Sequence, residues 1–235
     1  MSACAKSKGR LGTQLRGKLQ KDYLARGKTR YSLWYAYSSK AQADVVLHGD
    51  TQYYHFLLVE SDPHVSSANY EAQAHAAQIV GEELGEVVTA ELSMADGSTV
   101  WRCVRAEESA SLTTKVENLR LFSEQCEHKG LPTRVEVLCA HEITANPVRI
   151  QNWNRLQPYL AQARGWPLHE FGNELAALLR THNEVALSEV TALSSPGQES
   201  LYIAALLRGV QLGRYQSNLN EKAWGLSSRF WVAAP

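Results

Sequence analysis

An Asp96-Gly97 pair between two apolar runs is the feature that most constrains what this chain can fold into. Asp-Gly in that setting is among the strongest short signals of a β-hairpin, because glycine takes up the positive φ that a tight turn needs. The pattern predicts a first strand over residues 86–94, a turn over residues 95–98 and a second strand over residues 100–105. The chain is therefore expected to contain an antiparallel strand pair.

The segments around this hairpin predict an α/β core over residues 31–165. A dense apolar run, residues 53–60, is expected to end a helix, because Asp62-Pro63 follows it and the residue before proline leaves the helical region. Residues 73–79 are compatible with either a strand or a helix. The remaining elements are a helix capped by Ser109 or Ser111 and running to about Lys129, a strand over residues 134–140, and a helix over residues 148–163 that Asn146-Pro147 opens.

A second unit is expected over residues 166–235. Three short helices, over residues 168–180, 188–193 and 198–209, precede a strand over residues 210–215, an order typical of a winged-helix domain. The third helix would then occupy the recognition position, but its polar side chains are only Gln198, Tyr202 and Arg208. Docking against another protein or domain is therefore favoured over reading DNA bases.

Charge is distributed very unevenly along the chain. Residues 1–30 carry nine basic side chains and one acidic one, whereas the remaining 205 residues carry 15 basic and 23 acidic ones, so a +8 arm precedes a −8 body. Such an arm favours a polyanionic partner, most simply a nucleic-acid backbone. The alternative is a solubilising tail. The arm residues expected to contact DNA are Lys6, Lys8, Arg10, Arg16, Lys18 and Lys21.

Composition gives no indication of a membrane segment, a disulfide framework or a zinc site. No run of about 18 apolar residues occurs, and no apolar segment follows the basic N-terminus, so we expect a cytoplasmic protein without membrane contact. The four cysteines lie far apart with no C-x-x-C pair, and we expect three of them to be buried and reduced. They are Cys4, Cys103, Cys126 and Cys139.

Five short segments occur in the order and with the spacing of a known family. They are the helix end and D-P-x-V turn at residues 56–65, the Tyr-Glu-Ala-Gln run at 70–73, the turn at 95–97, the His-Glu-Ile run at 141–143, and the Arg-Ile-Gln-Asn-Trp run at 149–153. Over about four fifths of its length the chain resembles the TnsA-type endonuclease subunit of heteromeric cut-and-paste transposases. The resemblance implies a restriction-endonuclease-like (PD-D/E-x-K) fold for residues 31–165 and metal-dependent cleavage of one strand at the transposon end.

The residues that this chemistry needs are replaced. Carboxylates from a helix and two strands would hold Mg²⁺, and a lysine would orient the attacking water. The resemblance places these groups at Gln52, Thr89, Cys103 and Arg105. A thiol is too soft to favour magnesium, and an arginine stays protonated and cannot act as a base. We therefore expect a nuclease fold that does not cut, with no catalytic residue, cofactor or bound metal.

An alternative is an active Mg²⁺ endonuclease with relocated ligands. Glu91 follows Thr89 by two residues and so points to the same face of a strand. Together with Asp50, or with Glu107 or Glu108, it would restore a pair of metal-binding carboxylates. The more ordinary role for Glu91 is that of a solvent-facing strand residue.

Function is accordingly expected to lie in binding. The leading hypothesis is a noncatalytic subunit of a DNA transposition complex that contacts transposon-end DNA, the integrase-type transposase or an AAA+ ATPase regulator, partners that the resemblance implies. Arg102, Arg105 and Arg149 are candidates for a DNA-facing remnant of the active-site cleft. A third hypothesis is an adaptor or inhibitor in mobile-element defence or conflict.

Overall fold

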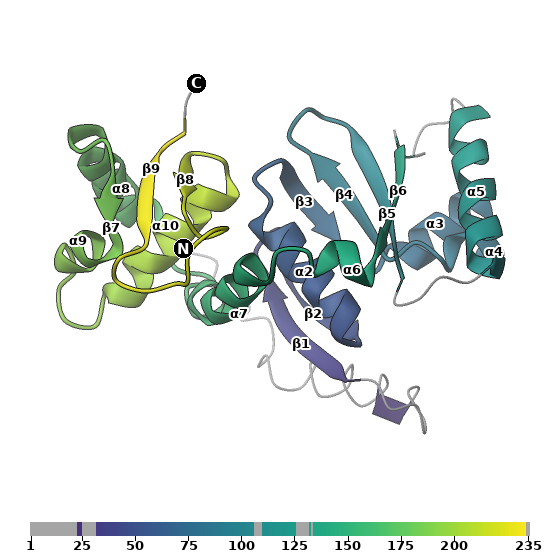
Figure 1. Ribbon diagram of the computed structural model, residues 1–235, viewed down its shortest axis with the longest axis horizontal. Helices are drawn as coiled ribbons and strands as arrows, with labels where there is room; N and C mark the ends of the chain where they lie inside the picture. The colour runs from purple at the N-terminus through teal and green to yellow at the C-terminus, as the bar shows by residue number, and fades with distance from the viewer. Residues whose placement is uncertain (1–22, 25–31, 106–109, 126–131, 133, 234–235) are drawn as a thin grey trace, which may run out of the picture.

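The protein is a mixed α/β chain in which two units lie side by side (Figure 1). The computed structural model describes residues 23–24, 32–105, 110–125, 132 and 134–233. None of the helices within those ranges combines the length and the apolar composition needed to cross a bilayer.

A four-stranded mixed sheet organises the first unit. Its order is β3-β4-β5-β6, with β3, β4 and β5 antiparallel and β6 parallel to β5. The predicted hairpin is confirmed as β4 and β5, and Gly97 takes the expected positive φ of 84° in its turn. The strands are β3 (Val65–Asn69), β4 (Ala90–Met94), β5 (Thr99–Arg105) and β6 (Arg134–Cys139).

The first strand of this hairpin is shorter than predicted, because β4 begins only at Ala90, after the short helix α4 (Glu82–Gly85) and a link. Gly85 packs directly against the backbone of Ala77 in α3 (Ala72–Val80). The segment that sequence left between strand and helix is therefore helical. Residues 86–88 serve as the link from α4 into the sheet.

Helices cover both faces of the sheet, as the alternation of side chains along β5 requires. Val100 packs with Val59 of α2 (Asp50–Ser61), which is the helix predicted to end before Pro63. On the opposite face, Trp101 and Cys103 pack with Val116 of α5 (Ala110–Gln125). This helix also makes the crossover between the parallel strands β5 and β6.

An additional hairpin precedes α2 and was not predicted. Strands β1 (Leu33–Ser38) and β2 (Ala43–His48) pair antiparallel. Their turn places Gln42, which is not a glycine, at a φ of 53°, so the sequence carries none of the usual turn signals there. Trp34 stacks on Tyr53 with ring centroids 4.1 Å apart and so anchors the hairpin to α2.

A long helix connects the two units. After the short α6 (Ala140–Ile143), α7 (Pro147–Gln162) begins where Asn146-Pro147 predicted it, and the Asn146 side chain accepts a hydrogen bond from the backbone N–H of Arg149 at 2.9 Å. Its buried face carries Trp153 and Leu156.

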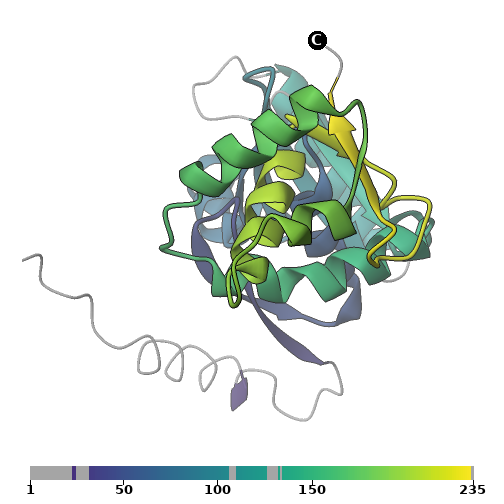
Figure 2. The same ribbon diagram turned by 90° about the vertical axis from the view of Figure 1, so that its left-hand side faces the viewer.

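The second unit contains the three predicted helices and a small sheet of order β7-β9-β8. Figure 2 views the molecule from this side, with the green to yellow helices in front of the rest of the chain. The predicted strand over residues 210–215 is wrong in its first part, because α10 continues through Gln211 and only Tyr215 enters a strand. The elements are α8 (His169–Thr181), β7 (Val185–Ala186), α9 (Leu187–Ala192), α10 (Glu199–Gln211), β8 (Tyr215–Ser217) and β9 (Arg229–Val232).

One hydrophobic core is common to both units. Phe56 of α2 and Trp153 of α7 belong to the same buried cluster as Leu206 of α10 and Phe230 of β9. Because burial of apolar surface is the main stabilising contribution to folding, the two units stabilise one another. The sheet-and-helix unit thus gives way to the helical second unit near residue 165, while the hydrophobic core continues across that boundary.

Candidate functional site

Two of the four positions expected to hold the nuclease site border one small cavity. Gln52 lies in the first turn of α2, and its Oε1 accepts a hydrogen bond from the backbone N–H of His48 at 2.9 Å. Thr89 precedes β4, and its Oγ1 accepts from the backbone N–H of Val104 at 3.0 Å. Both residues line a cavity of about 240 Å³. Each side-chain oxygen is thus used to hold backbone in place.

The same cavity contains a histidine that sequence reasoning missed. His55 is 1 % exposed, and its burial, with the positive charge of Arg102 acting in the same direction, lowers its pKa to about 3. Its ring is therefore neutral at physiological pH, and its Nε2 has no hydrogen-bond partner among the described residues. No sequence signal could have singled it out, because it lies inside an apolar helical run.

The other two expected positions lie beneath α5, on the face of the sheet away from α2. Cys103 is 1 % exposed, and burial raises the pKa of its thiol to about 11, so it is protonated and a poor metal ligand. The buried Arg105 donates from Nη1 to the Thr113 hydroxyl at 3.2 Å. Thr89 lies beside these two residues, because its Oγ1 accepts a hydrogen bond from the backbone N–H of Val104 between them, but none of the four positions carries an anionic oxygen.

The acids considered as relocated ligands are also held by other side chains. Asp50 accepts a hydrogen bond from Nε1 of Trp34 at 2.8 Å. Glu91 accepts from Nε1 of Trp101 at 2.7 Å and contacts Nδ1 of His75 at 2.8 Å. Glu107 and Glu108 lie outside the described residues. Within the described part of the chain, no three His, Cys, Asp or Glu side chains are grouped so that they could hold a metal ion.

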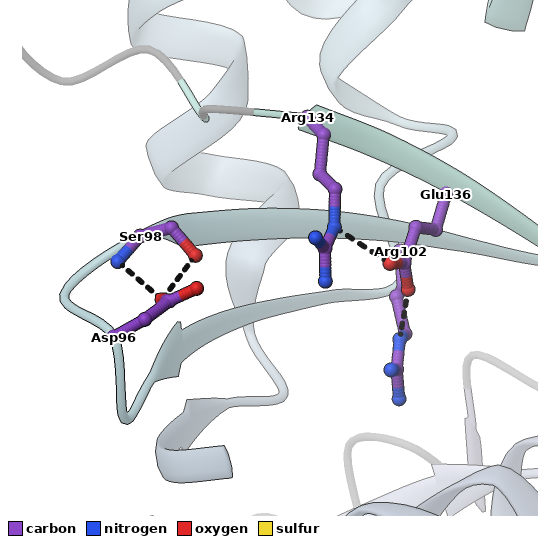
Figure 3. Close-up of polar contacts among 5 residues, drawn as sticks. All are labelled: Asp96, Ser98, Arg102, Arg134 and Glu136. Carbon is purple, nitrogen blue, oxygen red and sulfur yellow. Dashed lines mark hydrogen bonds and ion pairs between the residues drawn. The ribbon is translucent and has the colours of Figure 1, made fainter. Parts of the chain in front are cut away.

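The arginines proposed as a DNA-facing remnant contact other parts of the protein. Arg102 donates from Nε to Glu136 at 2.9 Å, and the same carboxylate binds Nε of Arg134 at 2.8 Å, as Figure 3 shows beside the Asp96–Ser98 turn contacts. Arg149 donates to Ser61 and to the backbone carbonyl of Leu58. Arg105 donates to Thr113 and Arg149 to Ser61 and Leu58, so the guanidinium groups of both are used inside the protein. Their contacts argue against Arg105 and Arg149 as phosphate contacts.

The six basic arm residues predicted to contact DNA lie outside the described residues, as do Cys4 and Cys126. Of the other two cysteines, Cys103 is buried as predicted, whereas Cys139 is partly exposed, and both are free thiols.

Neither a scan against models of protein families nor a search of curated proteins found a match for this chain. What the site can do chemically therefore rests on its geometry. The cavity beside Gln52 and Thr89 is lined by the neutral imidazole of His55, amide and hydroxyl groups, and the carboxylate of Glu71. Its side chains are therefore mainly neutral hydrogen-bonding groups, with a single acid among the described lining residues.

Proposed function

We propose that this protein is a noncatalytic TnsA-like subunit of a DNA transposition complex, which binds transposon-end DNA and holds the integrase-type transposase or an AAA+ regulator. The proposal rests on what the residues at the positions assigned to the nuclease site do in the structure. Gln52 and Thr89 hold backbone N–H groups, and Cys103 lies in an apolar core. A site built to hold Mg²⁺ would keep anionic oxygens at these places.

The architecture of the first unit supports the nuclease-like part of the proposal. Helix α2 lies against a mixed sheet whose central strands are the hairpin β4 and β5. The resemblance assigns its metal-binding strand positions to Thr89, just before β4, and to Cys103 in β5. The nuclease scaffold would thus be kept while its chemistry is lost.

The second unit supports a docking role. Its order of helix, strand, two helices and two strands is typical of winged-helix domains, in which the third helix reads the major groove. Here Tyr202, Leu206 and Leu207 of α10 are buried, and the helix packs against α7 and α8. A helix enclosed in this way does not enter a DNA groove, so the unit would bind protein.

DNA contact would come mainly from the arm. Its +8 charge precedes a body of −8, which by itself repels a phosphate backbone. Each arm residue that neutralises one phosphate adds about 0.9 to the slope of log affinity against log salt concentration. The predicted binding is therefore independent of sequence and strongly dependent on salt.

The test combines a cleavage assay with a binding assay on the full chain. Supercoiled plasmid incubated with Mg²⁺ or Mn²⁺ should stay intact. A duplex should bind with a salt slope that falls by about three units when Lys6, Lys8 and Arg10 are changed to Gln together. The purified chain should also retain an integrase-type transposase or its AAA+ regulator in a pull-down.

Metal-dependent nicking that disappears in Glu91→Ala, but persists in the exposed control Glu170→Ala, would establish the active-endonuclease alternative instead. A duplex affinity and salt slope unchanged by the arm substitutions would contradict the role assigned to the arm. Capture of a foreign transposase with loss of that enzyme's activity would favour the adaptor or inhibitor hypothesis.

A further inference from the structure

A cavity lies where the two units meet. It measures about 620 Å³, within the range of small-molecule sites. Its walls come from the turn after β1, the end of α7, one side of α8, the end of α10 and the segment entering β8. Residues far apart in the sequence therefore surround one space.

The lining of this cavity is strongly basic although the body of the protein is acidic. Four arginines and His169 line it, and none of its lining residues, all within the described part of the chain, is Asp or Glu. The arginines come from four separate segments. They are Arg164 after α7, Arg180 in α8, Arg208 in α10 and Arg214 before β8.

The arginines influence one another and the tyrosines between them. Burial is the main cause that lowers the pKa of Arg208; Glu60 and Tyr37 oppose that fall, and the positive charge of Arg214 adds to it. Burial raises the pKa of Tyr215, while the charges of Arg214 and Arg180 oppose that rise. The positive charges are therefore close enough to act together on a ligand in the cavity.

Guanidinium N–H groups remain for such a ligand. Among the contacts given for the described residues, Arg164 uses only Nη1, which binds both oxygens of Asp44 at 2.8 and 3.0 Å. Arg180 uses Nε, at 2.9 Å from the carbonyl of Ala176, and Arg208 uses Nη1, at 2.9 Å from Oε1 of Gln211. Because each guanidinium carries five N–H donors in a planar fork, most of them stay available to a bidentate oxyanion.

Aromatic and apolar surface completes the walls. Tyr37 and Tyr215 line the cavity, with the guanidinium of Arg164 lying 5.6 Å from the centroid of the Tyr37 ring. Trp166 at the edge is 59 % exposed, which is unusual for so large an apolar side chain. Exposed aromatic rings beside arginines are the elements that stack on a flat base while its phosphate is bound.

We propose that this cavity binds a nucleotide, with its phosphate on Arg180 and Arg214 and its base against Trp166. The nucleotide would be either free or the phosphorylated end of a nucleic-acid strand, since both present the same phosphate and base. This site goes beyond the proposed function, because it involves neither the basic arm nor the former nuclease positions.

The experiment is calorimetric titration of the full chain with AMP, inorganic phosphate and a short single-stranded oligonucleotide carrying a 5′-phosphate, with tryptophan fluorescence as a second readout. Saturable AMP binding is expected, with inorganic phosphate weaker because it lacks the base. Arg180→Gln and Arg214→Gln should each weaken AMP binding about tenfold or more, since each removes a charge-assisted contact. Trp166→Ala should weaken AMP but leave inorganic phosphate unchanged.

Arg155→Gln is the matched control, because Arg155 is an exposed arginine of α7 that does not line the cavity. All three substituted arginines are exposed, so the fold should survive. Tighter binding of the oligonucleotide than of AMP would identify a strand end as the source, and the reverse a free nucleotide. The proposal would be overturned if no probe bound saturably, or if Arg155→Gln and Arg214→Gln lost AMP affinity equally. Neither result bears on cleavage or on DNA binding by the arm.

Discussion

Gln211 joins the end of α10 to Glu60 at the end of α2, 151 residues earlier in the chain. Its Nε2 donates to the backbone carbonyl of Glu60 at 2.9 Å and to the Glu60 carboxylate at 3.1 Å. The Ser39 hydroxyl donates to the same carboxylate at 2.8 Å. Glu60 is 0 % exposed, and a buried carboxylate is tolerated only when such donors surround it.

Loss of this junction should destabilise the whole chain. Gln211→Leu removes donors from a buried carboxylate and should lower the free energy of unfolding by about 2 to 3 kcal/mol. Urea denaturation measures the change. The exposed Gln162→Leu in α7 is the control and should stay within about 0.5 kcal/mol of the parent protein. Equal stability of the two variants would show that the junction contributes nothing.

His55 should make stability fall with acid. Its pKa in the folded protein, about 3, lies below the ordinary value of 6.5, so the unfolded chain binds a proton that the folded chain excludes. Stability is therefore complete above pH 6.5 and decreases as the pH falls from 6.5 toward 3, by about 1.4 kcal/mol per unit in the fully titrating range.

The check is denaturation of His55→Gln and the parent protein between pH 7 and pH 5. The variant should lose less stability over that interval, whereas the exposed His169→Gln should follow the parent. Parallel curves for His55→Gln and the parent would contradict a buried neutral imidazole.

Any side chain at position 85 should destabilise the protein. A Cβ placed there would lie 2.4 Å from the backbone nitrogen of Ala77, so α3 and α4 would have to separate. Gly85→Ala is expected to lower the melting temperature, with a loss of about 1 to 3 kcal/mol. Gly172→Ala in α8, where a Cβ meets nothing within 4 Å, should be neutral or stabilising. Similar melting temperatures for the two variants would count against the close packing of α3 on α4.

Arg149 should matter for stability and not for DNA affinity. Its Nε lies 2.6 Å from the Ser61 hydroxyl, and its Nη2 lies 3.2 Å from the carbonyl of Leu58, so it satisfies the carboxyl end of α2. Arg149→Met should cost about 2 kcal/mol in chemical denaturation. Its duplex affinity should match that of the exposed control Arg155→Met. A selective drop in affinity would return Arg149 to the set of DNA contacts.

Several features of the protein follow from local sequence alone. Asp96-Gly97 specified the β4–β5 turn, and Asn146-Pro147 specified the start of α7, because turn and cap preferences act over three or four residues. Gln52, Thr89 and Cys103 lack anionic oxygens in any fold. The chemical reason to expect no Mg²⁺ site at these positions could therefore be given from the sequence.

Other features depended on contacts between distant segments. The β1–β2 turn has no glycine signal, and Gln42 takes its positive φ in a hairpin that stacking of Trp34 on Tyr53 anchors. Helix α10 extends past the predicted start of a strand because Gln211 reaches Glu60 in a core that both units build.

The sequence by itself determined the β4–β5 turn, the start of α7, the charge contrast between arm and body, and the absence of anionic oxygens at the positions that the resemblance assigns to a metal site. Only the tertiary structure decided that Arg149 supports a helix end, that Cys103 lies beneath α5, and that four separate arginines surround one cavity. The physical reason is that turn chemistry and side-chain chemistry are properties of neighbouring residues, whereas burial and charge clustering arise only when separate segments of the chain pack together in three dimensions.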